Sequence, residues 1–219
     1  MSTVQSTRGA LFDLGSVLVR VDIDDFDQLA DSVGCDREEL IAVLVGDYAA
    51  DTDHPFQRAE RGEITLAVAL HDIEGLANRR GFSIGAIRPQ LLEPAVEVNT
   101  ALVDEVTQLR SRGWRTGVVT NSVLEYSAIV DGLLPYDELF DCLIDSCRVG
   151  MRKPDVRIFR QALDLLGLEA ERVLFVDDQP GNVAAAAGLG MRTLLAKQFD
   201  TLASDVREHI EAWLGNDPS

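Results

Sequence analysis

The sequence predicts an α/β protein, a doubly wound parallel sheet that carries an inserted α-helical cap. Three observations lead to this expectation: short apolar runs recur along the chain, helical patterns lie between them, and one long stretch contains helical patterns only. Strands buried on both faces of a parallel sheet are typically continuous apolar runs. The chain of 219 residues is long enough for one such domain with a smaller insertion.

The first strand is expected at residues 9–13, where an apolar run ends in Asp13. Four later segments are also short and apolar, and most of them end in polar or acidic residues. These are residues 115–121, 140–145, 172–178 and 191–195. The alternation of strands with helices predicts a parallel sheet with helices on both faces.

Helical patterns separate these strands at residues 98–112, 154–166 and 181–189. Pro154 is expected to open the second of these helices and Gly167 to end it, because proline fits the first helical turn and glycine fits the position after the last turn.

Residues 22–94 contain no strand signal, and their patterning is helical. Helices are expected at residues 25–33, 36–48, 55–60 and 63–80. We therefore expect two domains: a sheet domain formed by residues 1–21 and 95–219, and a helical cap domain formed by residues 22–94.

The chain is strongly acidic, with 37 acidic and 20 basic residues and a net charge of −17. This charge repels phosphodiester backbones and anionic membranes, so neither nucleic acid nor membrane is an expected partner. No export signal or apolar stretch of about 18 residues is visible. The three cysteines form no C-x-x-C pair, which is typical of a reducing compartment. A cytoplasmic location is expected.

Polar residues collect where the expected strands end. In an open α/β sheet, ligands bind outside the carboxyl ends of the strands, so we expect these side chains to form one site. The strand-end residues are Asp13, Thr120, Asn121, Asp177 and Asp178, and Lys153 lies in a loop just before a helix.

Carboxylates that meet without a cation repel each other, and one of them must take up a proton. Mg²⁺ resolves this conflict, since it prefers oxygen ligands and binds through one or two carboxylates together with phosphate oxygens. Asp13 and Asp178, with Asp177 nearby, supply that pattern. One oxygen of Asp13 then remains to attack phosphorus and form an aspartyl-phosphate.

A phosphoryl group in such an acidic protein needs local cations and hydrogen-bond donors. Lys153 offers a charge, Thr120 offers a hydroxyl, and main-chain N–H groups at residues 14, 15 and 121 complete a cradle, with Gly15 permitting close approach of the chain. A lone Asp at a strand end is more often a cap or turn residue. It is the joint occurrence of these residues at one sheet edge that favours a catalytic site.

Four segments resemble the four motifs of the haloacid dehalogenase superfamily, in the same order. They are FDLGSVLV at 12–19, VVTNS at 118–122, RKPDVRIF at 152–159 and FVDD at 175–178. The resemblance extends from residue 8 to about residue 196 and implies a Rossmann-like core.

The resemblance implies that Asp13 is the nucleophile and a Mg²⁺ ligand. It also implies that Gly15 offers a main-chain carbonyl to the metal, and that Asp177 and Asp178 bind it. Thr120 and Asn121 would hold the phosphoryl group and Lys153 would stabilise it. Residues 22–94 would correspond to the helical cap that one large subgroup carries between its first and second motifs.

The sequence departs from the usual pattern of these phosphatases at Gly15, where most carry a second Asp as general acid and base. The D-L-G-x-V form is similar to a subgroup that includes sugar-1-phosphate phosphatases and the phosphatase-like domains of some epoxide hydrolases. The expected reaction is hydrolysis of a small phosphorylated metabolite, with weak or altered general acid catalysis. Asp22 and Asp24 are weak candidates for the missing role.

Three other functions share parts of this pattern. A metal-free dehalogenase would also use Asp13, but the paired acids Asp177 and Asp178 disfavour it. A phospho-acceptor signalling module carries its paired acids on the first strand, and here that order is reversed. A catalytically weak phospho-ligand-binding protein remains an alternative, because Gly15 removes a proton donor and leaves the phosphate cradle intact.

The role of two cap arginines stays open in the sequence. Arg58 and Arg61 have the reach to bind a second anionic group of a substrate, but ordinary salt links at a joint between two helices are the favoured interpretation. The cap side chains decide the substrate, and the sequence does not give their orientation.

Overall fold

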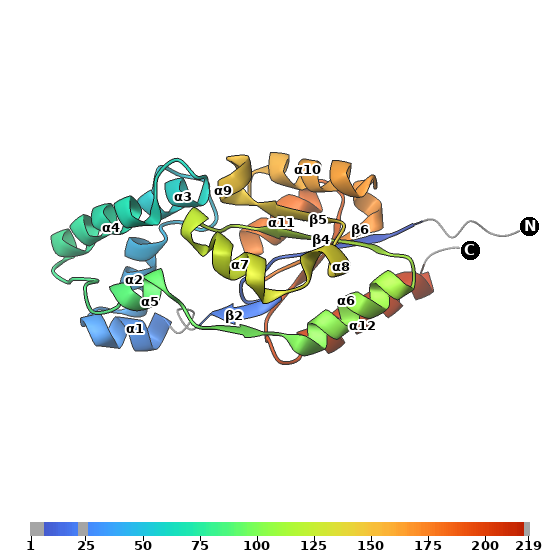
Figure 1. Cartoon of the computed structure of the whole chain (residues 1–219), viewed down its shortest axis with the longest axis horizontal. Helices are drawn as coiled ribbons and strands as arrows, with labels where there is room; N and C mark the ends of the chain where they lie inside the picture. The colour runs from blue at the N-terminus through green and yellow to red at the C-terminus, as the bar shows by residue number, and fades with distance from the viewer. Residues whose placement is uncertain (1–6, 22–25, 217–219) are drawn as a thin grey trace, which may run out of the picture.

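A computed structural model describes residues 7–21 and 26–216 of the chain. Its central sheet is parallel and has the strand order β5-β4-β1-β6-β7 (Figure 1). The strands are β1 (Gly9–Phe12), β4 (Arg115–Thr120), β5 (Cys142–Asp145), β6 (Val173–Asp177) and β7 (Arg192–Leu195). All five expected strands are therefore confirmed, and so is the α/β fold class.

The chain builds the sheet outward from β1 in two directions. It continues from β1 to β4 and β5 on one side, and then returns to place β6 and β7 on the other side. Gly9 at the start of β1 pairs with both Arg115 and Val173, so the carboxyl ends of the three central strands lie at the same level. Such a reversal of strand order opens a crevice at the carboxyl edge, and Asp13 is the first residue beyond β1 there.

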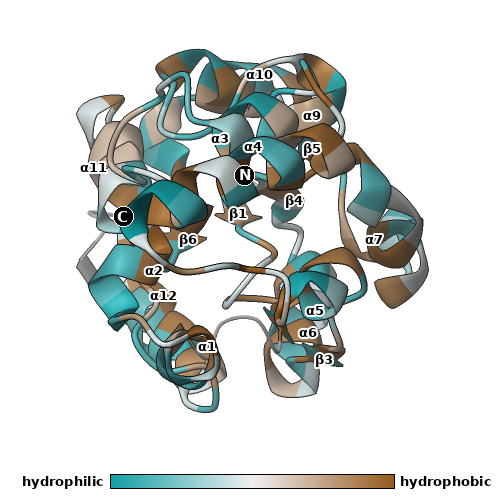
Figure 2. Ribbon diagram, turned by 90° about the vertical axis from the view of Figure 1, so that its left-hand side faces the viewer, coloured by the Kyte–Doolittle hydropathy of each residue, from teal (hydrophilic) through white to brown (hydrophobic). Residues whose placement is uncertain are grey.

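Helices cover both faces of the sheet (Figure 1). One face packs against α10 (Val156–Leu166) and α11 (Pro180–Gly188), and the other against α6 (Thr100–Ser111) and α12 (Leu202–Asn216). Successive residues of β1 point to opposite faces: Leu11 joins the first of these two cores and Phe12 joins the second. The strands are drawn mainly in brown in Figure 2, as expected for a sheet buried on both faces.

Helix ends follow local capping chemistry. The α6 helix begins after Asn99, whose side chain accepts a hydrogen bond from the main-chain N–H of Leu102 at 3.0 Å. The α10 helix ends at Gly167, as expected, with a left-handed φ of 60°. Its start differs from the expectation: Asp155 caps the helix, so Pro154 lies before the first turn and not within it.

The described part of the segment 22–94 contains helices only. These are α1 (Phe26–Val33), α2 (Arg37–Leu44), α3 (Pro55–Glu60), α4 (Leu66–Arg80) and the unexpected short α5 (Arg88–Leu92). They enclose a hydrophobic cluster of their own, in which Leu40, Leu66 and Ile73 are almost fully buried. In Figure 1 this helical group lies to the left of the sheet.

Two short strands, absent from the sequence expectation, join the cap to the sheet domain. The antiparallel pair consists of β2 (Val19–Val21) and β3 (Val96–Val98), with Val19 opposite Val98. These strands carry the chain toward the cap and back, so the two connections are hydrogen-bonded to each other. Paired connections of this kind hold the cap close to the site more firmly than two independent loops.

The remaining helices are short. They are α7 (Ser127–Leu133), α8 (Tyr136–Leu139) and α9 (Ser146–Val149), together with 3₁₀ turns at Leu124–Tyr126 and Ala170–Arg172. No helix within residues 7–21 and 26–216 is both long and apolar enough to cross a membrane.

Candidate active site

The structure brings the expected site residues together at the carboxyl edge of the sheet. Asp13 follows β1, Thr120 ends β4 and Asp177 ends β6. The three strands are neighbours in the sheet, with β1 between β4 and β6. Lys153 reaches the same place from the loop before α10.

The ammonium group of Lys153 lies between two carboxylates. Its Nζ is 2.7 Å from Oδ1 of Asp13 and 2.7 Å from Oδ2 of Asp177, and its side chain is 1% exposed. Burial opposes the charge of Lys153, but the two carboxylates outweigh burial and raise its pKa. The lysine is therefore charged, and it supplies the local cation that a phosphate group would need in this acidic protein.

Asp13, Asp177 and Asp178 form a cluster in which one oxygen of each carboxylate lies within 4.8 Å of the others. Burial raises the pKa of Asp13 to about 8, against the influence of Lys153, and the charges of Asp177 and Asp178 add to the rise. Burial and the charge of Asp177 raise the pKa of Asp178 to about 6. Three oxygen donors that repel one another in this way fit a hard divalent cation such as Mg²⁺.

Asp177 is held more firmly than the other two acids. Its Oδ1 accepts hydrogen bonds from the main-chain N–H of Gln179 at 2.8 Å and from Nδ2 of Asn182 at 3.0 Å. Gln179 is the cap residue of α11 and Asn182 lies in its first turn, so a main-chain N–H and a side-chain amide at the start of this helix both hold Asp177. Asn182 is not among the site residues predicted from the sequence. Its position in the first turn after the acidic pair is the signal that points to it.

The side chain of Asn121 binds the main chain of Lys153 in both directions. Its Oδ1 accepts from the N–H of Lys153 at 2.8 Å, and its Nδ2 donates to the carbonyl of Lys153 at 3.0 Å. The amide therefore fixes the loop that presents Lys153. The family resemblance assigns a contact with the phosphoryl group to Asn121. Because its side-chain amide is already hydrogen-bonded at both ends, this contact would have to come from the main chain of Asn121.

Gly15 lies beside Asp13 in open space. A Cβ added at this position would meet no atom within 4 Å, and Gly15 is not among the glycines with positive φ. The left-handed conformation belongs to the next residue, Ser16, with a φ of 56°. The chain therefore does not need glycine at position 15 for its backbone, and a side chain there would enter the cavity.

A cavity of about 400 Å³ lies over Asp13. Residues of the sheet domain line one side of it, including Gly15, Thr120, Lys153 and Asp178. The cap contributes the other side, with Phe26, Arg37, Ile41, Val45, Tyr48 and Phe56. A site enclosed in this way suits a small molecule, and the cap residues contact the part of it that lies away from Asp13.

A second, smaller cavity of about 170 Å³ adjoins the first. Its lining is mainly apolar and includes Val19, Val96, Val123 and Val130. The two cavities share five lining residues: Gly15, Tyr48, Phe56, Thr120 and Asn121.

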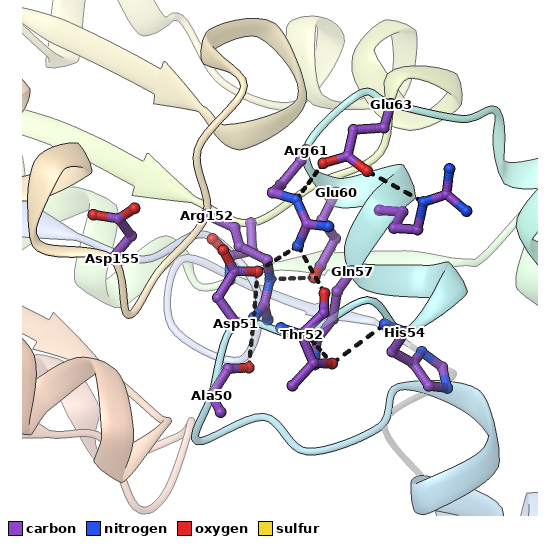
Figure 3. Close-up of polar contacts among 12 residues, drawn as sticks. Ala50, Asp51, Thr52, His54, Gln57, Glu60, Arg61, Glu63, Arg152 and Asp155 are labelled. Carbon is purple, nitrogen blue, oxygen red and sulfur yellow. Dashed lines mark hydrogen bonds and ion pairs between the residues drawn. The ribbon is translucent and has the colours of Figure 1, made fainter.

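The two cap arginines form salt links within the cap. Arg61 pairs with Asp51 and, at 2.6 Å, with Glu63 (Figure 3). Arg58 pairs with Glu63 at 3.2 Å. Neither arginine is among the residues that line the two cavities. These contacts agree with the interpretation that Arg58 and Arg61 form salt links within the cap and do not bind substrate. The other candidates near the cap, Asp22 and Asp24, lie outside the described residues.

A buried arginine that sequence analysis missed links the lysine loop to the cap. Nε of Arg152 donates to Oε2 of Glu60 at 2.8 Å, and Nη1 donates to the carbonyl of Ala50 at 3.2 Å (Figure 3). Glu60 also accepts a hydrogen bond from the hydroxyl of Tyr48 at 3.2 Å. Arg152 and Glu60 are 92 residues apart in the chain, so no local sequence pattern predicts their contact.

Comparison with known proteins gives curated relatives and solved structures. The chain is 30% identical to bifunctional epoxide hydrolase 2 of Rattus norvegicus over 216 residues, which is 92% of this chain and 38% of the relative. It is 31% identical over 124 residues to the glyceraldehyde 3-phosphate phosphatase of Methanothermobacter thermautotrophicus, covering 55% of this chain and 51% of that one. The chain thus spans well under half the length of the epoxide hydrolases that it matches.

The fold has close neighbours among solved structures. An enzyme of the haloacid dehalogenase family from Bacteroides thetaiotaomicron, solved as a magnesium complex, matches with a TM-score of 0.64 and 22% identity, over 88% of this chain and 94% of that one. The family model of the haloacid dehalogenase-like hydrolases matches residues 7–190, which include all four sequence motifs. On this match and the arrangement of Asp13, Lys153, Asp177 and Asp178, the chain belongs to the haloacid dehalogenase-like hydrolases.

Proposed function

We propose that this hydrolase is a Mg²⁺-dependent phosphatase that cleaves small phosphate monoesters with Asp13 as its nucleophile. One observation carries the proposal: Lys153 lies 2.7 Å from both Asp13 and Asp177, at the edge of a carboxylate cluster that includes Asp178. The cluster gives a divalent cation its ligands, and the lysine gives the phosphoryl group a cation.

Asp13 is oriented for attack by two contacts to one of its oxygens. Its Oδ1 pairs with Nζ of Lys153 and accepts a hydrogen bond from the main-chain N–H of Leu14 at 2.7 Å. We assign the other oxygen, Oδ2, to attack on phosphorus. Bond formation from Oδ2 expels the alcohol and leaves an aspartyl-phosphate, which water then hydrolyses to restore the carboxylate.

The phosphoryl group is held by residues around the mouth of the crevice. Lys153 neutralises one of its oxygens, and the hydroxyl of Thr120, which lines the same cavity, donates to another. The metal would be held by Asp13 and Asp178, by the carbonyl of Gly15, and by Asp177 directly or through water. When bound, Mg²⁺ supplies positive charge that offsets the repulsion among phosphate and carboxylates.

The remainder of the substrate lies toward the cap. Within the described residues, the cap side of the cavity presents one cation, Arg37, among apolar side chains such as Phe26 and Ile41. A small phosphorylated metabolite suits this lining, and its second polar or anionic group would reach Arg37. Curated relatives described as phosphatases support this class of reaction, and the acidic cluster disfavours a metal-free dehalogenase.

A panel of aryl, acyl, sugar and alkyl phosphates, assayed with Mg²⁺ and with EDTA, tests the proposal. Release of phosphate that requires Mg²⁺ is expected, and Ca²⁺ should replace it poorly because its coordination shell is larger and looser. Full turnover in EDTA would contradict the metal-dependent reaction. Binding of phosphate without turnover of any ester would support the alternative, a phospho-ligand-binding protein.

A further inference from the structure

The proposed reaction lacks a general acid at position 15, because this residue is glycine. No carboxylic acid stands two residues after Asp13 to protonate the departing alcohol, and the space beside Gly15 is open, since a Cβ there would meet nothing within 4 Å. Gly15 lines both cavities of the site. A group that replaces the missing acid has to reach this shared space.

Among the described residues, one ionisable side chain lines both cavities, and it is Tyr48. The cavity over Asp13 also contains Arg37, Lys153 and Asp178. Arg37 does not release a proton at neutral pH. Lys153 is paired with two carboxylates, and Asp178 belongs to the metal cluster.

The surroundings of Tyr48 keep its hydroxyl protonated. The hydroxyl donates to Oε1 of Glu60 at 3.2 Å, and Oε2 of Glu60 accepts from Nε of Arg152 at 2.8 Å. The guanidinium of Arg152 lies 5.4 Å from the centre of the tyrosine ring. Burial raises the pKa of Tyr48 well above its ordinary value, Glu60 and Asp13 add to the rise, and Arg152 opposes it.

We propose that Tyr48 donates the proton to the leaving-group oxygen, in place of the acid missing at Gly15. The inference rests on the proposed phosphatase function. The hydroxyl of Tyr48 releases its hydrogen bond to Glu60 and turns its O–H toward the ester oxygen. As the bond between phosphorus and the ester oxygen breaks, the proton of Tyr48 moves to that oxygen, and a neutral alcohol leaves. The phenolate then takes a proton from the water that attacks the aspartyl-phosphate, which restores Tyr48, Asp13 and free phosphate.

The proton matters most when the alcohol is a poor leaving group. General acid catalysis is worth about 10²–10⁴-fold, and a tyrosine with a raised pKa is a weak acid, so we expect the lower end of this range for Tyr48. Alkyl phosphates need this help because an alkoxide is a strong base. Aryl phosphates leave as phenolates and need little of it.

The variant Tyr48→Phe, compared by kcat/KM on alkyl and aryl phosphates of similar size, tests the inference. We expect a loss of about 10²-fold for the alkyl ester and little change for the aryl ester. Tyr136→Phe is the matched control, because Tyr136 lies on α8 outside both cavities and its buried hydroxyl has no hydrogen-bond partner in the described part of the chain. Recovery of the alkyl rate in Gly15→Asp/Tyr48→Phe would support the assignment further.

An equal loss on both esters, or no loss on the alkyl ester, would overturn the role of Tyr48. The role would also be overturned if kcat/KM for the alkyl ester alone fell in Asp22→Asn or Asp24→Asn and did not fall in Tyr48→Phe. If Tyr48→Phe does not fold, 3-fluorotyrosine at position 48 keeps the ring and makes a stronger acid, and an unchanged ratio of alkyl to aryl rates would overturn the inference. Failure of the wild type to cleave any ester would instead overturn the proposed function itself.

Discussion

Arg152 and Glu60 form an ion pair in which both side chains are almost fully buried, at 0% and 1% exposure, with 2.8 Å between Nε and Oε2. Arg152 precedes Lys153 in the chain, and Glu60 ends α3 in the cap. The pair therefore connects the loop of the site lysine to the helices that cover the site. If the cap moved away from the sheet domain, either this ion pair would break or the loop that contains Arg152 would move with the cap.

Breaking one side of the pair should be costly. Glu60→Gln removes the nearer counterion of the buried Arg152 and leaves Asp51, whose Oδ1 lies 3.9 Å from Nη1, so the free energy of unfolding should fall by about 3 kcal/mol. Glu63→Gln is the control, since Glu63 forms its salt links with Arg58 and Arg61 at the surface and its loss should cost about 0.5 kcal/mol. Urea unfolding measures both. Equal losses in the two variants would show that burial of the pair has no special effect.

The carboxylate cluster predicts a pH-dependent effect of Mg²⁺ on stability. Folding raises the pKa from its ordinary value of 3.8 to about 8 for Asp13 and to about 6 for Asp178. At pH values between the ordinary and the raised pKa, the folded protein therefore binds more protons than the unfolded chain. The metal-free protein should therefore lose stability as pH rises from about 4 to about 8. Mg²⁺ binds the ionised acids, and the rise in Tm that it causes should grow over the upper part of this range. If the increase in Tm caused by Mg²⁺ were the same at every pH, the carboxylate cluster would not be the metal site.

Asp178→Asn separates repulsion from metal binding. It removes one of three crowded acids, so the variant without metal should melt at a higher temperature than the wild type at pH values near 8, where the wild-type carboxylates repel each other most. Addition of Mg²⁺ should then raise its Tm less than it raises that of the wild type. Calorimetry with and without Mg²⁺ checks both effects, and a metal-free variant that is less stable than the wild type would be the opposite result.

Arg37 should determine how the enzyme binds the distal part of its substrate. Arg37→Gln removes the cap cation of the main cavity and should raise KM about tenfold for esters with a second anionic group, with kcat nearly unchanged, because a charged hydrogen bond of about 1.4 kcal/mol is lost equally in ground and transition states. Arg58→Gln is the control, since Arg58 lines neither cavity. Equal KM values for wild type and Arg37→Gln on every ester would remove Arg37 from substrate recognition.

The sheet and its site edge were predictable because their signals are local. Each central strand is an apolar run that ends in a polar residue of the site, as in β1 before Asp13 and β6 at Asp177. The two-stranded connection was not predictable in the same way. Its strands β2 and β3 have three residues each, and they pair across an insertion of more than seventy residues.

The residues around the site that escaped prediction depend on distant contacts. Arg152 is a common surface residue type, and only its burial against Glu60 gives it a role. Tyr48 carries no motif, and it reaches the site because the cap folds over Asp13. Side chains that a second domain brings in from elsewhere in the chain leave no periodicity or spacing in the sequence around the catalytic motifs.

The proposed nucleophile can be identified by trapping the intermediate. During turnover of an aryl phosphate with Mg²⁺, rapid quenching and borohydride reduction convert an aspartyl-phosphate into an alcohol that peptide mass spectrometry locates. We expect this modification at Asp13, and none in Asp13→Asn, whose turnover should fall below about a hundredth of the wild-type rate. Turnover with the modification absent from Asp13, or an Asp13→Asn variant that keeps more than this rate, would contradict the covalent mechanism.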